Sequence, residues 1–253
     1  MSILKALEKH PTYENFEACC PHCKKWSIYN RASDLKTFRL VTGQTVRCQN
    51  TECGKEFSIG GDLINPAWQM ILMDCEVLKQ QRRYSSCVLN LAQAFEIYFA
   101  LFLRVELVYK PYGIEKSYDL DRRNELSVLL FEITRKWTFF PLRNIFIALL
   151  LKQSKPNTMT ESEVVIKSLP SIANTEPSDE AIFALPDQKL SEILLELKKS
   201  TVSSLRNNVV HKDAYRPTIE EVEKAIEESS RILYRLEHCL NVLMDQPWFY
   251  ESL

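Results

Sequence analysis

The chain is poor in glycine, with five glycines among 253 residues. Neither GxxxxGK[ST] nor GxGxxG occurs, which excludes a P-loop and a dinucleotide-binding fingerprint. A surplus of positive charge is also missing, because the formal net charge is −1. The protein is therefore no bulk polyelectrolyte, and any contact with RNA or DNA must come from local patches of Lys and Arg.

Long hydrophobic runs are missing as well. The most apolar stretches, Leu91–Leu103 and Phe139–Leu151, are 13 residues each, and residues such as Glu96 and Pro141 interrupt them. Both are shorter than a helix that spans a bilayer, so they predict core helices and no membrane contact. The first residues, Met1–Lys5, lack the apolar core of a signal peptide. We therefore expect a cytoplasmic protein.

Eight cysteines without an export signal favour metal ligands or buried thiols over disulfides. Cys20 and Cys23 enclose two residues, and after 24 further residues Cys48 and Cys53 enclose four. Two such pairs can supply four thiolates to one tetrahedral zinc ion. The pattern resembles a zinc ribbon over about residues 15–60. Four sulfurs leave no open coordination position, so we expect structural zinc and no catalytic metal.

The residues around the cysteines fit a small β domain. Trp26–Tyr29 and Thr37–Val41 have the composition of strands, and Thr42–Gln44 offers a turn. The four-residue gap of the second pair departs from the usual two. Cys19 and His22 are alternative ligands, and unligated thiols are the competing interpretation.

A first domain of residues 1–62 is predicted to precede a mainly α-helical domain of residues 63–253. Residues 154–186 predict an irregular, mobile insertion, because Ser, Thr, Pro and Asn are frequent there, with one short helix near Glu163–Leu169. Elsewhere apolar residues recur with helical spacing. The expected helices are Ala67–Arg83 and Ser86–Tyr109 (one long helix or two, stopped by Lys110–Gly113), Asn124–Thr138 and Leu142–Gln153 (separated or kinked at Pro141), Asp187–His211, and a last helix from a capping box at Thr218–Glu221 to about Asp245.

The helix expected to end near His211 carries the strongest candidate for chemistry. Arg206, Asn207 and His211 bring a fixed cation, an amide and a side chain that titrates near neutral pH to one helix end. On an ideal helix, Asn207 and His211 lie about 40° apart around the axis, whereas Arg206 and His211 lie about 140° apart. We therefore expect either a helix that frays before His211 or a site completed by a second copy across a two-fold axis. The structural alternative is a His and an Arg that interact with the helix dipole and the last carbonyl groups.

The stretch Leu205–His211, followed by a capped terminal helix with Glu220–Val222, resembles the C-terminal half of the HEPN superfamily of helical-bundle proteins. Ala94–Leu101, with an acidic residue inside an apolar run, is similar to the first-helix pattern of that family. The resemblance covers about residues 66–245, interrupted by residues 154–186. In the family, Arg-x(4–6)-His, often with Asn after the Arg, marks metal-independent endoribonucleases.

The resemblance implies a homodimer that cuts tRNA or another cellular RNA by attack of its 2′-hydroxyl on the adjacent phosphate. His211 would exchange the proton, Arg206 would neutralise the phosphorane, and Asn207 would orient His211 or the phosphate. Glu96 would hold Arg206 or His211, with a structural ion pair as its alternative role. The reaction would need no metal. Such nucleases act as toxins or in defence against phage, held off by an antitoxin or triggered by a partner protein.

Two further functions are compatible with the sequence: a non-catalytic, dimeric HEPN-type sensor that binds nucleic acid or nucleotide, and a helical adaptor. The ribbon can contact single-stranded nucleic acid or dock a protein, and pairs of basic residues can line an RNA path or form solvated faces. The ribbon candidates are Lys24, Lys25, Trp26, Arg39, Arg47 and Lys55. The basic pairs are Arg82-Arg83, Arg122-Arg123 and Lys198-Lys199.

Overall fold

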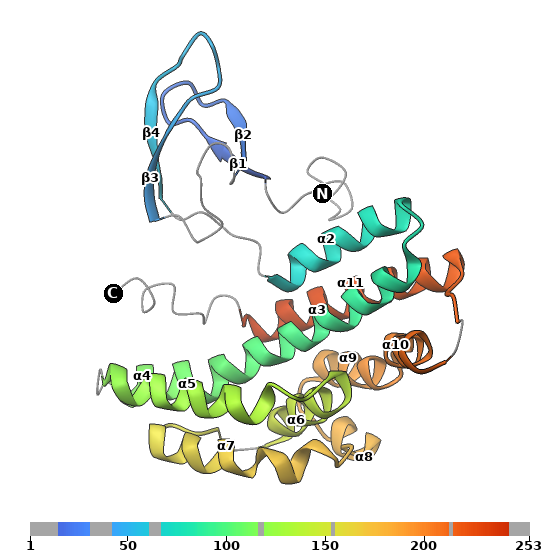
Figure 1. Cartoon of the computed structure of the whole chain (residues 1–253). Helices are drawn as coiled ribbons and strands as arrows, with labels where there is room; N and C mark the ends of the chain where they lie inside the picture. The colour runs from blue at the N-terminus through green and yellow to red at the C-terminus, as the bar shows by residue number, and fades with distance from the viewer. Residues whose placement is uncertain are drawn as a thin grey trace.

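The computed structural model describes residues 15–30, 42–60, 67–115, 119–152, 155–212 and 215–242. It contains a small β-rich part toward the N-terminus and a bundle of helices (Figure 1). The predicted mainly α fold with a small β part is thereby confirmed. The predicted domain boundary between residues 62 and 63 lies outside the described residues.

Two antiparallel hairpins form the β-rich part. β1 (Asn15–Cys19) pairs with β2 (Trp26–Asn30), and β3 (Thr42–Arg47) pairs with β4 (Glu56–Gly60). Their buried side chains form a small core distinct from the core of the helices. Its members are Cys20, Tyr29, Val46, Cys48, Phe57 and Ile59.

The strand predicted at Trp26–Tyr29 is confirmed by β2, whereas the turn predicted at Thr42–Gln44 is wrong. These residues begin β3, and the pairing with β4 shifts register between Thr42 and Gln44. Gly43 lies at the irregularity, where a residue without a side chain is readily accommodated. The strand predicted at Thr37–Val41 lies outside the described residues.

A hairpin of two helices opens the bundle. α2 (Ala67–Gln80) and α3 (Tyr84–Arg104) lie side by side (Figure 1). The chain reverses between them through Arg82, which adopts the left-handed conformation with φ +57°. Of the two alternatives predicted for this region, two helices in close succession is confirmed.

The run from Tyr84 to Glu115 is long and apolar enough to cross a membrane by length and composition alone. However, 56% of its most apolar window is buried inside the protein, as in the core helix of a soluble bundle. Within this run, α3 contacts α2, α6 (Phe139–Leu151), α10 (Thr201–His211) and α11 (Ile219–Leu240). The stretch Leu91–Leu103 therefore lies in the core helix that its composition predicted.

The chain does not leave the helix at Lys110–Gly113 as predicted. It continues through a π-helical turn, η2 (Val105–Tyr109), into α4 (Lys110–Glu115). Pro111 has no N–H, and its ring would collide with the carbonyl group four residues earlier in a regular α-helix. The wider π turn directly before Pro111, closed by the Lys110 N–H donating to the Val105 carbonyl oxygen, gives the ring room.

The next two helices begin earlier than predicted. α5 (Leu120–Thr134) starts where the Asp119 carboxylate accepts the Arg122 N–H at 2.9 Å. α6 starts at Phe139, so Pro141 neither separates nor kinks two helices but lies in the first turn. A proline is tolerated there because the first N–H groups of a helix have no intrahelical acceptor.

Residues 155–186 are largely helical, so the predicted irregular insertion is wrong, whereas the helix predicted near Glu163–Leu169 is confirmed and is longer than expected. They form α7 (Met159–Ala173), which packs against α5 and α6, and the short α8 (Asp179–Phe183). Thr158 and Ser178 accept N–H groups at the start of these helices. The polar residues that suggested a loop are thus partly helix caps, and Pro170 lies on the exposed side of α7.

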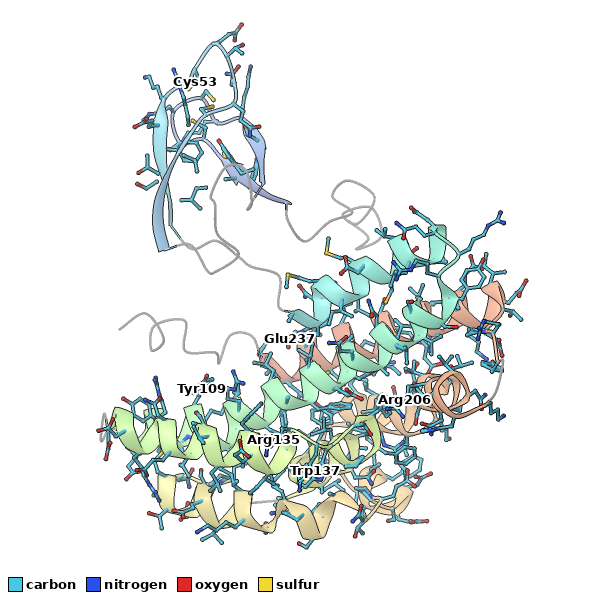
Figure 2. All side chains as sticks on the ribbon, in the orientation of Figure 1. Cys53, Tyr109, Arg135, Trp137, Arg206 and Glu237 are labelled. Atoms are coloured by element: carbon cyan, nitrogen blue, oxygen red, sulfur yellow. The ribbon has the colours of Figure 1, made fainter. Side chains whose placement is uncertain are left out.

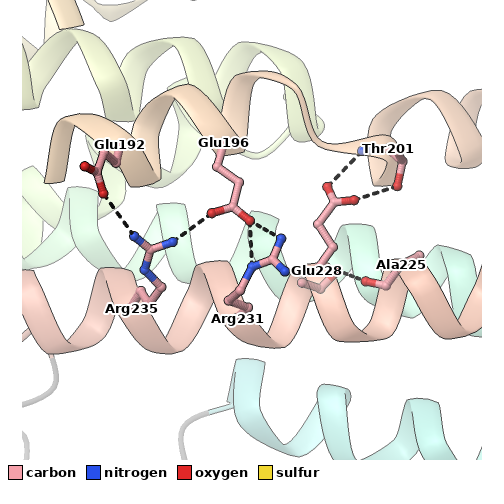
Figure 3. A network of polar contacts seen from close by, with 8 residues as sticks. Glu192, Glu196, Thr201, Ala225, Glu228, Arg231 and Arg235 are labelled. Atoms are coloured by element: carbon pink, nitrogen blue, oxygen red, sulfur yellow. Dashed lines mark hydrogen bonds and ion pairs between the residues drawn. The ribbon is translucent and has the colours of Figure 1, made fainter. Parts of the chain in front are cut away.

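The single helix predicted over Asp187–His211 is two helices, α9 (Gln188–Lys198) and α10. At the break, the carboxylate of Glu228 in α11 accepts both the N–H of Thr201 at 2.9 Å and its hydroxyl at 2.8 Å (Figure 3). Glu228 is buried. The Ser200 hydroxyl accepts the Val202 N–H at 3.3 Å, and the Glu228 carboxylate satisfies the Thr201 N–H from another helix, so a new helix can begin there.

Ion pairs also hold α9 against α11. Glu196 of α9 accepts Arg231 Nε at 2.7 Å and Arg235 Nη1 at 2.8 Å (Figure 3). Together with the contacts of Glu228, these ion pairs hold α9 and α10 against α11.

α11 begins with the predicted capping box, which is confirmed. The Thr218 hydroxyl accepts the Glu221 N–H at 3.2 Å, and the Glu221 carboxylate accepts the Thr218 N–H at 2.8 Å. Asn241, in the left-handed conformation with φ +49°, ends the helix. The helix therefore ends at Leu240, and the predicted end near Asp245 is wrong.

Candidate functional site

Four cysteines meet where the two β hairpins turn (Figure 2 labels Cys53). The Sγ atoms of Cys20, Cys23, Cys48 and Cys53 lie within 4.8 Å of one another, with 3.9 Å between Cys20 and Cys53 and 3.7 Å between Cys23 and Cys48. Four sulfurs around zinc at 2.3 Å lie about 3.8 Å apart. The four predicted ligands therefore have the spacing needed to hold a metal ion such as zinc.

The two cysteine turns are built alike, although one encloses two residues and the other four. Each turn closes with a hydrogen bond from the N–H of its first cysteine, and the residue after its second cysteine adopts a left-handed conformation. The hydrogen bonds are Cys20 N–H to the Lys25 carbonyl oxygen (3.0 Å) and Cys48 N–H to the Lys55 carbonyl oxygen (2.9 Å), and the left-handed residues are Lys24 (φ +58°) and Gly54 (φ +52°).

The surroundings of the sulfurs act on their pKa values in opposite directions. A hydrogen bond from the Lys25 backbone lowers the pKa of the Cys23 thiol to about 6. Burial raises the pKa of the Cys48 thiol to about 12. Because a metal binds the thiolate, metal binding at neutral pH must release the proton of Cys48.

Cys19 and His22 do not belong to the cluster, so the alternative ligand sets are wrong. The Cys19 thiol donates to the Cys20 carbonyl oxygen at 3.9 Å. His22 Nε2 lies 3.2 Å from the Glu56 carbonyl oxygen, so this side chain links the first cysteine turn to β4.

The candidate catalytic residues lie in the last two turns of α10 (Figure 2 labels Arg206). Arg206 is half-buried, and its Nη1 donates to the exposed Asn207 Oδ1 at 3.2 Å. His211 is the last residue of the helix. The helix therefore does not fray before His211, which was one of the two expected arrangements. Its exposed imidazole has no hydrogen bond or ion pair with any other residue that the structure describes.

Glu96 of α3 has a role that neither of its predicted alternatives includes. Its carboxylate accepts the Phe139 N–H at 2.8 Å and so caps α6, where the side chain of Thr138 forms no capping bond. Burial raises the pKa of Glu96, and the Phe139 N–H and the charge of Arg206 partly offset this rise. Glu96 therefore couples the start of α6 electrostatically to Arg206 on α10.

Tyr215, which the sequence did not single out, anchors the chain just beyond α10. Its hydroxyl donates to Glu221 Oε1 at 2.8 Å, and this carboxylate raises the pKa of the phenol, whereas the Asn208 side chain lowers it. Asn208 lies on α10, and Glu221 belongs to the capping box of α11. Tyr215 therefore connects the end of the candidate helix with the start of the last one.

Two of the basic pairs have structural partners. Arg122 donates to Glu125 at 3.1 Å and also bonds Glu163 of α7. Lys198 donates to the Pro177 carbonyl oxygen at 2.6 Å and bonds Asp179 of α8. These cations fasten α7 and α8 to the bundle, and the structure does not arrange them as a free RNA path.

The fold and these residues define a helical-bundle protein with a four-cysteine ribbon. Comparison with protein-family models, curated proteins and solved structures finds no match.

Proposed function

We propose that this chain is a metal-independent endoribonuclease of the HEPN type. The observation that supports this most directly is the surface position of the end of α10. An exposed imidazole, His211, follows one turn after Asn207, which Arg206 contacts at 3.2 Å. A free imidazole can exchange protons near neutral pH, and a guanidinium can neutralise the charge of a phosphorane.

In the proposed reaction, the 2′-hydroxyl oxygen of the RNA attacks the adjacent phosphorus, and the bond from phosphorus to the 5′-oxygen of the next nucleotide breaks. His211 accepts the 2′-hydroxyl proton or donates a proton to the leaving oxygen. Arg206 binds the non-bridging oxygens, and Asn207 orients the imidazole or the phosphate. The products are a 2′,3′-cyclic phosphate and a 5′-hydroxyl.

A homodimer completes the proposed site. Because α10 stays helical to His211, Arg206 and His211 of one chain point about 140° apart. Arg206 interacts with Glu96, whereas His211 is exposed. A two-fold axis beside α10 brings Arg206 of one protomer close to the partner's His211. A monomer in light scattering at micromolar concentration would contradict this arrangement.

The proposed biological role follows from the resemblance described for the sequence. The enzyme cleaves tRNA or another cellular RNA in the cytoplasm as a toxin or an antiviral effector, and an antitoxin or a trigger protein controls it. Zinc held by Cys20, Cys23, Cys48 and Cys53 stabilises the ribbon and takes no part in the chemistry.

The test is cleavage of total RNA and of tRNA by purified protein in buffer with EDTA and without magnesium. The zinc content of the protein is measured after the reaction by elemental analysis of the desalted sample, so that loss of the ribbon metal is distinguished from loss of activity. We expect cleavage to persist, with 2′,3′-cyclic phosphate ends. His211→Ala and Arg206→Ala should each reduce the rate by about 100- to 10,000-fold.

The matched control is Lys212→Ala, which removes an exposed charge directly after the helix and leaves the motif intact. It should cleave at the native rate. Cleavage that survives in His211→Ala, or that needs added magnesium, would overturn the proposed mechanism.

One observation favours a second function, a non-catalytic dimeric module that binds nucleic acid or nucleotide as a sensor. The charge of Arg206 acts on the Glu96 carboxylate and lowers its pKa, and His211 has no hydrogen bond or ion pair with any other described residue. Binding of RNA without cleavage, together with unchanged affinity in His211→Ala, would support this alternative over the nuclease.

A further inference from the structure

The ribbon exposes its most hydrophobic side chain next to the candidate metal site. Trp26 is 67% exposed, whereas Trp68 in the bundle is fully buried. Trp26 follows the first cysteine turn directly, and Glu56 occupies the equivalent place after the second turn. Neither the four sulfurs nor the small core of the ribbon uses Trp26. Because its indole stays in contact with water, Trp26 does not contribute the stabilising free energy that a buried indole would contribute.

Lysines surround the same end of the ribbon. Lys24 and Lys55 are exposed and have no partner among the described residues. Lys25 lies 3.8 Å from Glu52, and both side chains are largely exposed, so this pair adds little stability. Two cations next to the cysteine turns are therefore available to an anionic ligand.

The conformation of Lys24 adds an independent argument. Its left-handed backbone, with φ +58°, costs a residue with a Cβ atom about 1–2 kcal/mol, whereas the equivalent position of the second turn is Gly54. The fold alone favours glycine at both positions. A lysine at this strained position, two residues before the exposed Trp26, supports a role for its charge.

We propose that this end of the ribbon binds single-stranded nucleic acid, with Trp26 stacked on a base and Lys24 and Lys55 at the neighbouring phosphates. Every base has a face that can stack on an indole, and lysines near the ring bind the backbone without reading sequence. The inference concerns binding only and stands whether or not α10 cleaves RNA. If this end of the ribbon docks a protein instead, the zinc-loaded chain should not bind a single-stranded oligonucleotide through these three side chains.

The test uses the full chain, loaded with zinc, and a fluorescent oligo(dT). This ligand has no 2′-hydroxyl, so the proposed cleavage cannot consume it. Fluorescence anisotropy should show binding that weakens as salt increases. Trp26→Ala should weaken binding by about 5- to 150-fold, and Trp26→Phe should restore part of the loss.

Lys24→Gly is the most informative variant, because glycine suits the left-handed position better than lysine does. We expect it to fold at least as well as the native protein, to bind more weakly and to reduce the slope of log K against log salt by about 0.7. Phe183→Ala, which removes a 68% exposed aromatic side chain on α8, is the matched control and should bind like the native protein.

Two outcomes would overturn the proposal. One is no measurable binding of oligo(dT) by the zinc-loaded native protein at low salt. The other is binding that Trp26→Ala and Lys24→Gly leave unchanged, which would place the nucleic-acid contact elsewhere on the chain.

Discussion

At Glu96, one carboxylate of α3 accepts the Phe139 N–H at the start of α6 and interacts with the charge of Arg206. Glu96→Ala leaves this N–H without its acceptor, and we expect it to lower the free energy of unfolding by about 1–2 kcal/mol. Glu96→Gln keeps an oxygen acceptor and should cost less. Urea denaturation measures both, and equal losses would show that the hydrogen bond is not what Glu96 contributes.

The same residue predicts a pH dependence. Burial raises the pKa of Glu96, so the folded protein holds this proton more tightly than the unfolded chain. The free energy of unfolding should therefore fall as the pH rises from the unfolded pKa through the folded pKa. Glu96→Gln lacks this titration. The free energy of unfolding of both proteins is measured across that pH window. The native protein should become more stable relative to Glu96→Gln as the pH falls. A difference in stability that does not change with pH would contradict the raised pKa of Glu96.

Tyr215 gives a prediction about the end of the candidate helix. Tyr215→Phe removes the bond to Glu221 at 2.8 Å and should lower the free energy of unfolding by about 0.5–1.5 kcal/mol. Glu221 raises the pKa of the phenol, so the folded protein holds this proton more tightly than the unfolded chain. The native protein should therefore be more stable than Tyr215→Phe at neutral pH, and this difference in stability should decline as the pH rises through the raised pKa. Tyr84→Phe, whose hydroxyl has no partner among the described residues, serves as the control in chemical denaturation.

At the residue scale, local spacing predicted the four-cysteine cluster and the capping box, because their members act within short turns that sequence patterns record. It did not predict the partners of Glu96 or Tyr215. Glu96 and Phe139 are 43 positions apart, so their hydrogen bond depends on how α3 and α6 pack. The catalytic roles of Arg206, Asn207 and His211 remain predictions.

At the element scale, the break between α9 and α10 depends on a side chain from α11. Glu228→Ala removes the acceptor of the Thr201 N–H and hydroxyl and should cost about 1–3 kcal/mol, with the first turn of α10 fraying. Hydrogen exchange of the α10 amides measures the fraying. The exposed neighbour Glu227 supplies the control, because Glu227→Ala should leave these amides protected.

The predicted ends of helices were wrong where a contact outside the local sequence determines them. Apolar residues recur across residues 187–211, and the predicted single helix overlooked Ser200, whose hydroxyl caps α10; the contribution of Glu228 from α11 has no local sequence signal. The sequence predicts that the helix ends near Pro111, because no residue type or spacing marks the π turn that precedes this proline. The helix predicted near Glu163–Leu169 was too short for α7, because the residues at the start of α7, Thr158 among them, resemble loop residues.

At the scale of the whole molecule, the ribbon and the helices have separate hydrophobic cores. If a metal stabilises the ribbon, its removal by a strong chelator should unfold the hairpins while the helical circular dichroism remains nearly unchanged. Cys48→Ser should have the same effect, and Cys19→Ser, outside the cluster, should not. Loss of most helical signal on chelation would contradict two independent cores.

The contact between Glu228 and Thr201 also bears on synthesis. Because the chain is made from its N-terminus, Arg206, Asn207 and His211 leave the ribosome before Glu228 does. The helix that carries them thus receives its contact from Glu228 only once the first ten residues of α11 have been translated. A protein truncated before residue 228 contains every candidate catalytic residue but lacks the carboxylate that fixes their helix. In incomplete chains, the start of α10 is therefore expected to be held less firmly than in the full chain.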